Sequence, residues 1–565
     1  MAYDILIENA RIVDGTGAPA YDGNIAIAEG RIAGIGKVGG SAKQRIDAQG
    51  RVAAPGFIDV HTHYDAQLCW DPLLGSSVEH GVTSLMTGSC GIGIAPCRPA
   101  DRNDTVLDLV AVEGIAQEVL EAGIRWEFET FPEYMAAISR NGVGPNLGML
   151  VPLTPLRRFV LGPEALERAA TPEETQRIAR HLEDAVKAGA VGFSASLVPR
   201  QVGWGGRPLA SQLASRDELK AYCHVLRKLD RGLVQVNVTS QLSRVSDEEL
   251  ETLKMLVQES GRPVTWSGAI IRRDAPQDID TFLEKLDPVI RQGSRPQAMI
   301  REMWAEMNLR NPVLLADVEP IRRLLNKPRE ELMRAYADPS FRAEFKRAMA
   351  DDKPKVFGTA CVDCEVHHVK TQAMERYLRR TVSEVAVERG ADPYDTFFDL
   401  ALQDDLGMTY VGPIGNADLA RLRRMIVDPR IMIGMSDGGA HYDMLYEASY
   451  PTFMLGHWVR QEHALTLEHA VRRMTSEPAD FMRLSQRGRL REGLAADITV
   501  FDPATIGSAA KPEEVRHDLP AGGARLYSRA HGISHVLVNG QVEMNERGPT
   551  GAMAGQFLGG DKSSH

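Results

Sequence analysis

The sequence lacks long apolar runs, has few cysteines and carries no excess of positive charge. A membrane-spanning helix needs about 20 consecutive apolar residues, and no stretch approaches that length. Six cysteines in 565 residues are too sparse for a disulfide framework, so reduced thiols are expected. The net charge of -11, with acidic and basic residues interspersed, argues against a surface that neutralises phosphates. We therefore expect neither a membrane nor a nucleic acid as a partner.

The N-terminal segment also lacks the charged-then-apolar pattern of a signal peptide, which favours a cytoplasmic location. Hydrophobic residues make up 43% of the chain and charged residues 25%, as is typical of a globular protein with a large core. A small-molecule substrate is the expected partner. An exposed sheet edge could also pair two copies into a homo-oligomer.

Both ends of the chain have β-strand patterns. Short alternating segments separated by glycine-containing turns fill residues 3–53 and predict a small antiparallel sheet there; similar segments recur at 493–503 and 535–548. The simplest assembly is one small β-sandwich built from residues 1–55 and 481–550. Residues 551–565 are expected to form a flexible tail.

The middle of the chain, residues 56–480, alternates strand-like and helical segments. Thr171 is predicted to cap the helix that follows it, and Gly189 to end that helix. Eight candidate strands predict an α/β fold with a TIM-like (β/α)8 barrel. The candidates are residues 52–60, 81–88, 146–151, 190–196, 233–238, 262–268, 354–360 and 431–439.

A charged, helical segment at about 272–350 has no clear strand before Lys353, so we interpret it as an insertion after the sixth strand. Such an insertion could either cover the mouth of the barrel or form a solvated helical decoration.

The clearest chemical motif is His61-Thr62-His63, which follows an apolar strand. Side chains at i and i+2 of a strand project from the same face, so both imidazoles can reach one divalent ion. The carboxyl end of a barrel strand is where barrel active sites are built. Asp65 follows on the same face and could orient a histidine or line the pocket.

Two more candidates follow predicted strands. Asp437 lies among glycines, where its carboxylate could bind a metal or act as a general base; an Asx turn is the structural alternative. Cys90 lies in a loop of small residues and could bind the metal as a thiolate; a buried thiol is the alternative.

Other candidates have a weaker basis. Cys361, Cys364, His367 and His368 have a spacing that suits a soft metal or a pocket lining, although a second ligand pair is missing. His441 could contact substrate or support the metal ligands. Arg200 and Trp204 lie in a glycine-rich loop that could form a pocket or remain exposed.

Several segments together resemble the amidohydrolase superfamily, and within it the N-acyl-D-amino-acid deacylase (D-aminoacylase) family. The segments are PGFIDVHTHYD, the loop from Thr87 to Gly93, GAVGFSAS, SDGGAH and the closing MTSEPADFMRLSQRGRLREGLAADITVFDP. They occur in the family's order over nearly the whole chain. The resemblance implies a metallo-barrel joined to a composite β-sandwich.

Carried over by position, the resemblance makes His61, His63, Cys90 and Asp437 metal ligands, and makes Asp437 the proton shuttle as well. The family also takes one histidine each from its fifth and sixth strands. This sequence departs there, because Asn237 and Ser267 stand in those places. Three alternatives stay open: a single ion is retained at the remaining ligands, other histidines substitute, or the chemistry differs.

The leading hypothesis is hydrolysis of an amide in an N-acyl amino acid or a related compound. One or two divalent ions, with zinc as the first candidate, would activate water, and Asp437 would act as general base and acid. A related metallo-barrel reaction is one alternative, either opening of a cyclic amide or a deamination or lyase step. A non-catalytic binding protein on a degraded metallo-barrel is the other.

Overall fold

The structure is a computed structural model that describes residues 2–199, 201–325, 327–351, 355, 360–442, 447–509 and 514–560. The chain divides into two compact units. Unit 1 comprises Met1–Ala269, Asp280–Ile300 and Arg423–His565, and unit 2 comprises Ile270–Ile279 and Arg301–Leu422. No helix in these described ranges combines the length and the apolar character that crossing a bilayer would require.

Unit 1 contains a ring of parallel strands. Three positions in the ring are occupied by strands that an irregularity splits in two: β6 (Phe57–Asp59) with β7 (His61–Thr62), β9 (Asn146–Met149) with β10 (Val151–Pro152), and β18 (Met432–Ile433) with β19 (Met435–Gly438). The other positions are occupied by β8 (Val82–Thr87), β11 (Gly192–Ser196), β12 (Leu233–Asn237), β13 (Val264–Ser267) and β14 (Arg295–Ala298).

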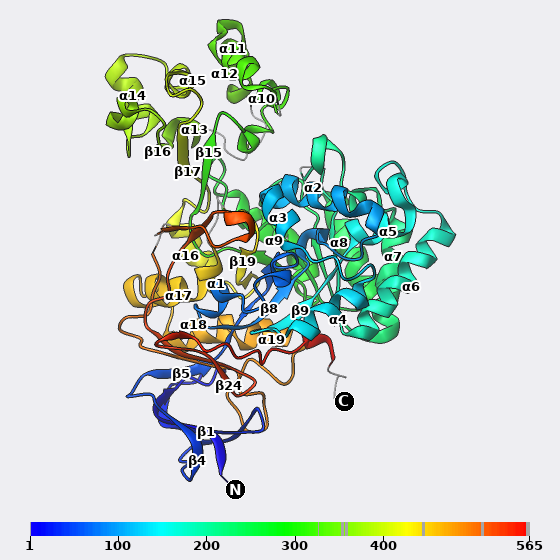
Figure 1. Cartoon of the computed structure of the whole chain (residues 1–565), viewed down its shortest axis with the longest axis vertical. Helices are drawn as coiled ribbons and strands as arrows, with labels where there is room; N and C mark the ends of the chain where they lie inside the picture. The colour runs from blue at the N-terminus through cyan, green and yellow to red at the C-terminus, as the bar shows by residue number, and fades with distance from the viewer. Residues whose placement is uncertain are drawn as a thin grey trace. The chain divides into compact units, whose positions relative to one another are not determined.

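Each of these strands pairs in parallel with the next, and β19 pairs with β7, so the ring closes. Figure 1 shows β8, β9 and β19 surrounded by the helices of unit 1. All six residues of β8 are buried, as expected for a strand covered on both faces. The predicted α/β fold class is therefore confirmed.

Helix α6 (Pro172–Ala188) begins and ends where the sequence predicted. Thr171 caps α6 by accepting from the backbone N–H of Glu174, and Gly189 ends the helix at φ 119°, which confirms both predictions. The longer helices are α2 (Arg102–Glu113), α4 (Phe131–Asn141), α5 (Leu153–Leu161), α6 (Pro172–Ala188), α7 (Arg216–Leu229), α8 (Asp247–Ser260), α9 (Asp278–Ile290), α16 (Leu419–Val427) and α18 (Leu467–Met474). The shorter ones are α1 (Gly75–Val78), α3 (Gln117–Gly123), α17 (Tyr450–Phe453) and α19 (Ser476–Phe481).

The seventh strand of the ring is not where the sequence pattern placed it. Strand β14 pairs with β13 on one side and with β18 on the other, inside the segment that was predicted to have no strand before Lys353. Its sequence, Arg-Pro-Gln-Ala, is short and has no β-branched residue, so pattern alone gives it no strand signal. The predicted strand at 354–360 lies outside the described residues except for its residues 355 and 360.

Both ends of the chain contribute to one nine-stranded sheet in unit 1. The strand order is β25-β24-β23-β20-β5-β1-β2-β3, with β4 paired to β1. Figure 1 shows the N-terminal strands in blue and the C-terminal strands in red on the same side of the unit. Apolar residues from both ends, including Ile7, Ile27 and Val500, form one buried cluster. The strands are β1 (Tyr3–Ile12), β2 (Tyr21–Ala28), β3 (Arg31–Gly36), β4 (Ala42–Asp47), β5 (Val52–Pro55), β20 (Ile498–Phe501), β23 (Ile533–Val538), β24 (Gln541–Asn545) and β25 (Gly548–Pro549).

The sequence predicted an antiparallel arrangement for the N-terminal part of this sheet. Strand β1 does pair antiparallel with β2, but it pairs parallel with β4 and β5. A separate antiparallel hairpin, β21 (Glu514–Arg516) with β22 (Arg525–Tyr527), lies between β20 and β23 in the sequence.

Unit 2 has its own core. Strands β15 (Met303–Asn308), β17 (Thr409–Gly415) and β16 (Glu365–His368) form an antiparallel sheet in that order. Buried aromatic residues, including Tyr336, Phe398 and Tyr410, lie in one hydrophobic cluster. The helices are α10 (Glu319–Arg322), α11 (Arg329–Ala337), α12 (Pro339–Ala350), α13 (Ala360–Asp363), α14 (Val382–Arg389) and α15 (Pro393–Gln403).

Glu543 of β24 has a buried carboxyl group that makes the stability of the protein depend on pH. Its Oε1 accepts from the Ala554 backbone N–H at 2.8 Å, whereas its buried Oε2 accepts from no group in the described part of the chain. Burial outweighs that single N–H and raises the pKa of Glu543 to about 7. The folded state therefore favours the protonated acid and loses stability as pH rises from 4.5 toward 7.

We expect Glu543→Gln to stabilise the protein at pH 8 by on the order of 1 kcal/mol, since it removes a buried, poorly paired charge. The gain should shrink as pH falls and disappear near the ordinary glutamate pKa. Thermal unfolding followed by circular dichroism across this pH range measures the difference. An equal gain at pH 8 and pH 5 would contradict the charge-based explanation.

Candidate metal centre

The two motif histidines share one face of the first barrel strand. The imidazoles of His61 and His63 are buried, with ring centroids 5.2 Å apart. Thr62 between them points elsewhere and donates to the carbonyl of Met86 at 2.7 Å. This is the alternation of a strand, and it brings both rings to the carboxyl end of the barrel.

Cys90 comes to the same place from the end of the second strand. Its Sγ lies 3.3 Å from Nε2 of His61, and its backbone N–H donates to Oε1 of Gln235 at 2.6 Å. Cys90 has φ 57°, a backbone conformation that is unusual for residues other than glycine. Gly91 follows, where an added Cβ would lie 2.7 Å from Cα of Ala195. The loop is therefore tightly held, and it directs the thiol at His61.

Asp437 completes the cluster from the last strand. Its Oδ1 lies 3.4 Å from Nε2 of His61 and 3.2 Å from Nε2 of His63. Asp437 also has a positive φ, 54°, and Gly439 beside it allows close packing, since a Cβ there would lie 2.8 Å from the His63 carbonyl carbon. The carboxylate thus faces the imidazoles.

Charges in this cluster stabilise one another. Burial alone would raise the pKa of Asp437, but the adjacent His63 and His61 imidazoles outweigh it and hold that pKa well below its usual range. For Cys90, burial is likewise outweighed by His61, so that its pKa falls to about 7. Burial would lower the pKa of His63, yet the neighbouring Glu113 carboxylate, with Asp437 and Cys90, raises it well above its usual value.

The donor set fits a divalent ion of the zinc type. One ligand atom each from His61, His63 and Cys90 lie within 4.8 Å of one another, the only such group of three in the part of the chain that the structure describes. Ligand atoms about 2.0–2.3 Å from a tetrahedral zinc ion lie about 3.3–3.8 Å from each other. The Cys90–His61 and Asp437–His61 distances of 3.3 and 3.4 Å fall in that range, and the Asp437–His63 distance of 3.2 Å is 0.1 Å below it.

The structure adds two residues that sequence reasoning missed. Glu113, the last residue of α2, is buried with Oε1 3.3 Å from Nδ1 of His63. Gln297 of β14 is buried with Oε1 2.6 Å from Nδ1 of His61. Neither belongs to a metal-ligand motif. Gln297 also lies in β14, the strand that the sequence pattern did not predict. Only a correct prediction of that seventh strand would have identified Gln297 as a candidate.

Asn237 and Ser267, at the places of the missing histidines, bond to each other rather than to the cluster. The Ser267 hydroxyl donates to Oδ1 of Asn237, whose Nδ2 donates to Oε1 of Gln201 at 2.9 Å. The Ser196 hydroxyl donates to the same Gln201 oxygen at 2.5 Å. These neutral groups give no imidazole or thiolate for a second ion.

Asp65 and His441 lie beside the cluster in backbone-supporting roles. The Asp65 carboxylate accepts from the Thr87 hydroxyl at 2.9 Å and from the Gly88 N–H at 3.0 Å, which fixes the turn before Cys90. The backbone N–H of His441 donates to the Glu113 carbonyl at 2.6 Å, and His441 has φ 50°. The Asp65 bonds thus hold the loop that carries Cys90, and the His441 bond connects Glu113 to the loop that carries Asp437.

The remaining candidates lie elsewhere. Cys361 and Cys364 are buried in the core of unit 2, where Sγ of Cys364 donates to the Cys361 carbonyl at 3.0 Å. In the same unit, His368 is exposed, and Nδ1 of His367 lies 3.3 Å from Nη1 of Arg379. Trp204 is 40% exposed, and Arg200 lies outside the described residues.

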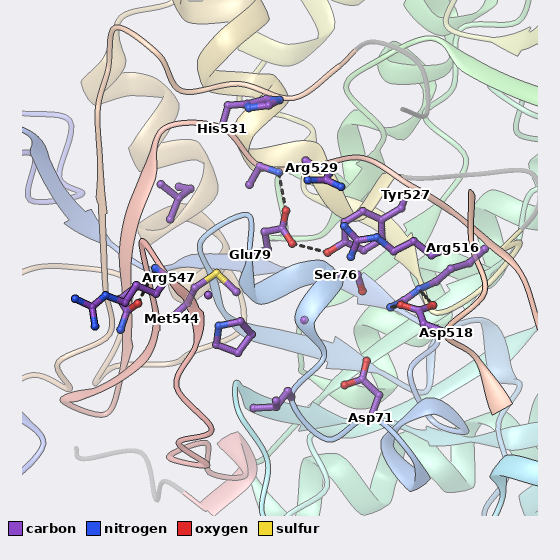
Figure 2. A pocket seen from close by; sticks show the side chains of 18 of the residues that line it. Asp71, Ser76, Glu79, Arg516, Asp518, Tyr527, Arg529, His531, Met544 and Arg547 are labelled. Carbon is purple, nitrogen blue, oxygen red and sulfur yellow. Dashed lines mark hydrogen bonds and ion pairs between the residues drawn. The ribbon is translucent and has the colours of Figure 1, made fainter. Parts of the chain in front are cut away.

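A cavity of about 850 Å³ lies apart from the cluster (Figure 2). It is lined by parts of the segments 70–79, 516–533 and 544–549, and none of the cluster residues lines it. Its charged side chains are largely used within the wall: Glu79 accepts from the Tyr527 hydroxyl at 2.5 Å, and Arg525 donates to Asp518 at 2.7 Å. The size of this cavity therefore does not identify the reaction site.

Comparison with known proteins gives consistent matches over the whole chain. The sequence profile of the amidohydrolase family matches residues 44–543. The D-aminoacylase of Alcaligenes xylosoxydans xylosoxydans is 27% identical, covering 98% of this chain and 97% of that protein. The N-acyl-D-aspartate deacylase of the same organism is also 27% identical, covering 98% and 95%.

The fold is matched as well. A crystal structure of N-acyl-D-glutamate deacylase from Bordetella bronchiseptica, complexed with zinc and a phosphonate inhibitor, has a TM-score of 0.67 and 24% identity. It covers 99% of this chain and 100% of that one. Together these matches confirm the resemblance that the sequence motifs predicted.

Proposed function

Since this chain belongs to the amidohydrolase family, we propose that it hydrolyses the amide bond of N-acyl-D-amino acids with the help of one divalent ion. The observation that carries the proposal is the convergence of His61, His63, Cys90 and Asp437, from three strand ends, with contacts of 3.2–3.4 Å. The D-configuration and the N-acyl group are inferred from the named relatives.

Zinc is the proposed ion, because two imidazoles, a thiolate and a carboxylate are donors that zinc accepts. A divalent ion bound there supplies an activated water molecule and polarises the scissile carbonyl. One ion is proposed because Asn237 and Ser267 form their own hydrogen bonds away from the cluster. The expected ligands are His61, His63, Cys90 and Asp437.

Asp437 is proposed to move the proton. Its carboxylate faces both imidazoles, and its side chain is 17% exposed whereas that of His61 is 1% exposed. It can therefore take a proton from the attacking water and deliver it to the leaving amine. The products are the acyl carboxylate and the free amino acid.

The glycines after Asp437 are proposed to let the Asp437 loop pack closely against the first barrel strand. Gly438 and Gly439 pack against Tyr64 and His63, where a Cβ would lie 2.6 Å from the Tyr64 hydroxyl oxygen and 2.7 Å from Cδ1 of Tyr64. A side chain at either position would displace Tyr64 or push the loop outward. Glycine therefore keeps the Asp437 loop against the histidines.

A substrate panel tests the reaction. We expect the zinc-loaded protein to release free amine and acetate from N-acetyl-D-amino acids with acidic and apolar side chains, and at least about tenfold more slowly from the L-isomers. Proton NMR of the reaction mixture follows both products. Release of ammonia, or opening of a cyclic amide with no N-acetyl hydrolysis, would contradict the proposal and favour a related metallo-barrel reaction.

A further inference from the structure

Each cluster histidine has a second buried side chain at its Nδ1 atom. His61 and His63 present Nε2 to Asp437, and His61 presents it to Cys90 as well. Their Nδ1 atoms meet Gln297 and Glu113, which come from β14 and from the end of α2. Histidines that bind metals commonly donate their other ring N–H to such an acceptor, which fixes the tautomer.

The orientation of Gln297 follows from its second hydrogen bond. Its Nε2 donates to the carbonyl of Val60 at 3.3 Å, so its Oε1 is the atom 2.6 Å from Nδ1 of His61. An amide oxygen can only accept, and therefore Nδ1 of His61 carries the hydrogen. The lone pair of the neutral ring is then on Nε2, facing the thiol and the carboxylate.

Glu113 lies at the corresponding place behind His63, with a carboxyl group in place of the amide. Its side chain is 3% exposed, and none of the described residues donates a hydrogen bond to its Oε1. Its nearest ionic partner among them is Nδ1 of His63 at 3.3 Å. A buried carboxylate is costly without a cationic or hydrogen-bonding partner, so its position against His63 needs a reason.

The backbone around Glu113 holds it there. Helix α2 ends at Glu113, and the next residue, Gly114, has φ 64°. The Glu113 carbonyl accepts from the N–H of His441, four residues after Asp437. The loop that carries Asp437 and the carboxylate behind His63 are thus fixed to each other.

We propose that Glu113 is a positioning residue that makes His63 the stronger donor of the pair, with Gln297 giving His61 a weaker, neutral support. The inference rests on the proposed metal centre. The Glu113 carboxylate places negative charge 3.3 Å from Nδ1, behind the ring, so it strengthens Nε2 as a ligand. The Gln297 amide fixes the Nδ1 hydrogen of His61 but adds no charge.

Zinc affinity, measured by competition with a chromogenic chelator, tests this in a graded series. Glu113→Gln keeps an acceptor but loses the charge, and should weaken zinc binding about tenfold; Glu113→Ala loses both, and should weaken it about a hundredfold. Gln297→Ala should weaken it about tenfold. Glu543→Gln, a buried carboxylate change in the terminal sheet, is the matched control and should leave affinity unchanged.

The cobalt(II)-substituted protein gives a readout that does not depend on substrate. The thiolate-to-cobalt band should persist in all variants, because Cys90 is intact, while the ligand-field bands should shift in Glu113→Gln relative to the control. Equal zinc affinity and identical spectra for wild type and Glu113→Gln would overturn the inference. A wild-type protein that binds no zinc would overturn it together with the proposed function. Tight zinc binding with the graded losses, but no N-acyl hydrolysis, would overturn the proposed function alone.

Discussion

Asp437→Asn is expected to lower kcat by about 10³-fold while the protein stays folded. Asparagine keeps the size and the oxygen that faces His61 and His63, but it cannot accept a proton at neutral pH. The proton of the attacking water then has no base, and the leaving amine has no acid. Steady-state kinetics on an N-acetyl-D-amino acid, with circular dichroism as the folding check, measures the effect.

A matched control exists at the other end of the same barrel strand. Asp428 precedes β18, and its carboxylate pairs with Arg430 at 2.5 Å rather than with a cluster residue in the described part of the chain. Asp428→Asn should therefore retain most of the activity. If Asp437→Asn were as active as Asp428→Asn, Asp437 would not be the proton carrier.

Removal of the divalent ion is expected to reduce hydrolysis to below about one per cent, since water alone has a pKa of about 15.7 and must be activated. Dialysis against a chelator followed by titration with zinc should restore activity at one equivalent per chain. The same titration should raise the melting temperature, because the ion binds the folded cluster and not the unfolded chain. Elemental analysis and differential scanning fluorimetry measure both effects.

The variant Cys90→Ala serves as the control for the site of binding. It removes the thiolate 3.3 Å from Nε2 of His61, and should lower the zinc-dependent rise in melting temperature. Full activity after chelation, with less than about a tenth of an equivalent of any transition metal left, would refute a metal-dependent reaction. Restoration only at two equivalents would refute the single-ion arrangement.

Much of the cluster was predictable because its signals are local. An i, i+2 spacing on a strand puts His61 and His63 on one face in any strand, and apolar segments before Cys90 and Asp437 mark the ends of barrel strands. Thr171 and Gly189 similarly bound a helix through bonds within a few residues. The use of these side chains as ligands stays a prediction until an ion is measured.

The residues behind the two histidines, Glu113 and Gln297, were not predictable because their positions depend on which distant segments meet. In the sequence, Glu113 has no feature that distinguishes it from other helix residues. It comes close to His63 only because the C-terminal end of α2 packs against the loop after Asp437. The neutral bonds of Asn237 and Ser267 likewise depend on the neighbouring strand ends.

The sequence alone determined the strand-end histidines, the thiol, the carboxylate and the repeated strand–helix order, since each follows from periodicity and short-range backbone chemistry. Tertiary structure alone decided that Arg295–Ala298 is the seventh strand, because a short polar segment becomes a strand only through its pairing with β13 and β18. With that strand in place, Gln297 comes behind His61, 236 residues away in the sequence. Contacts of such separation depend on how the ring closes, and no local pattern encodes them.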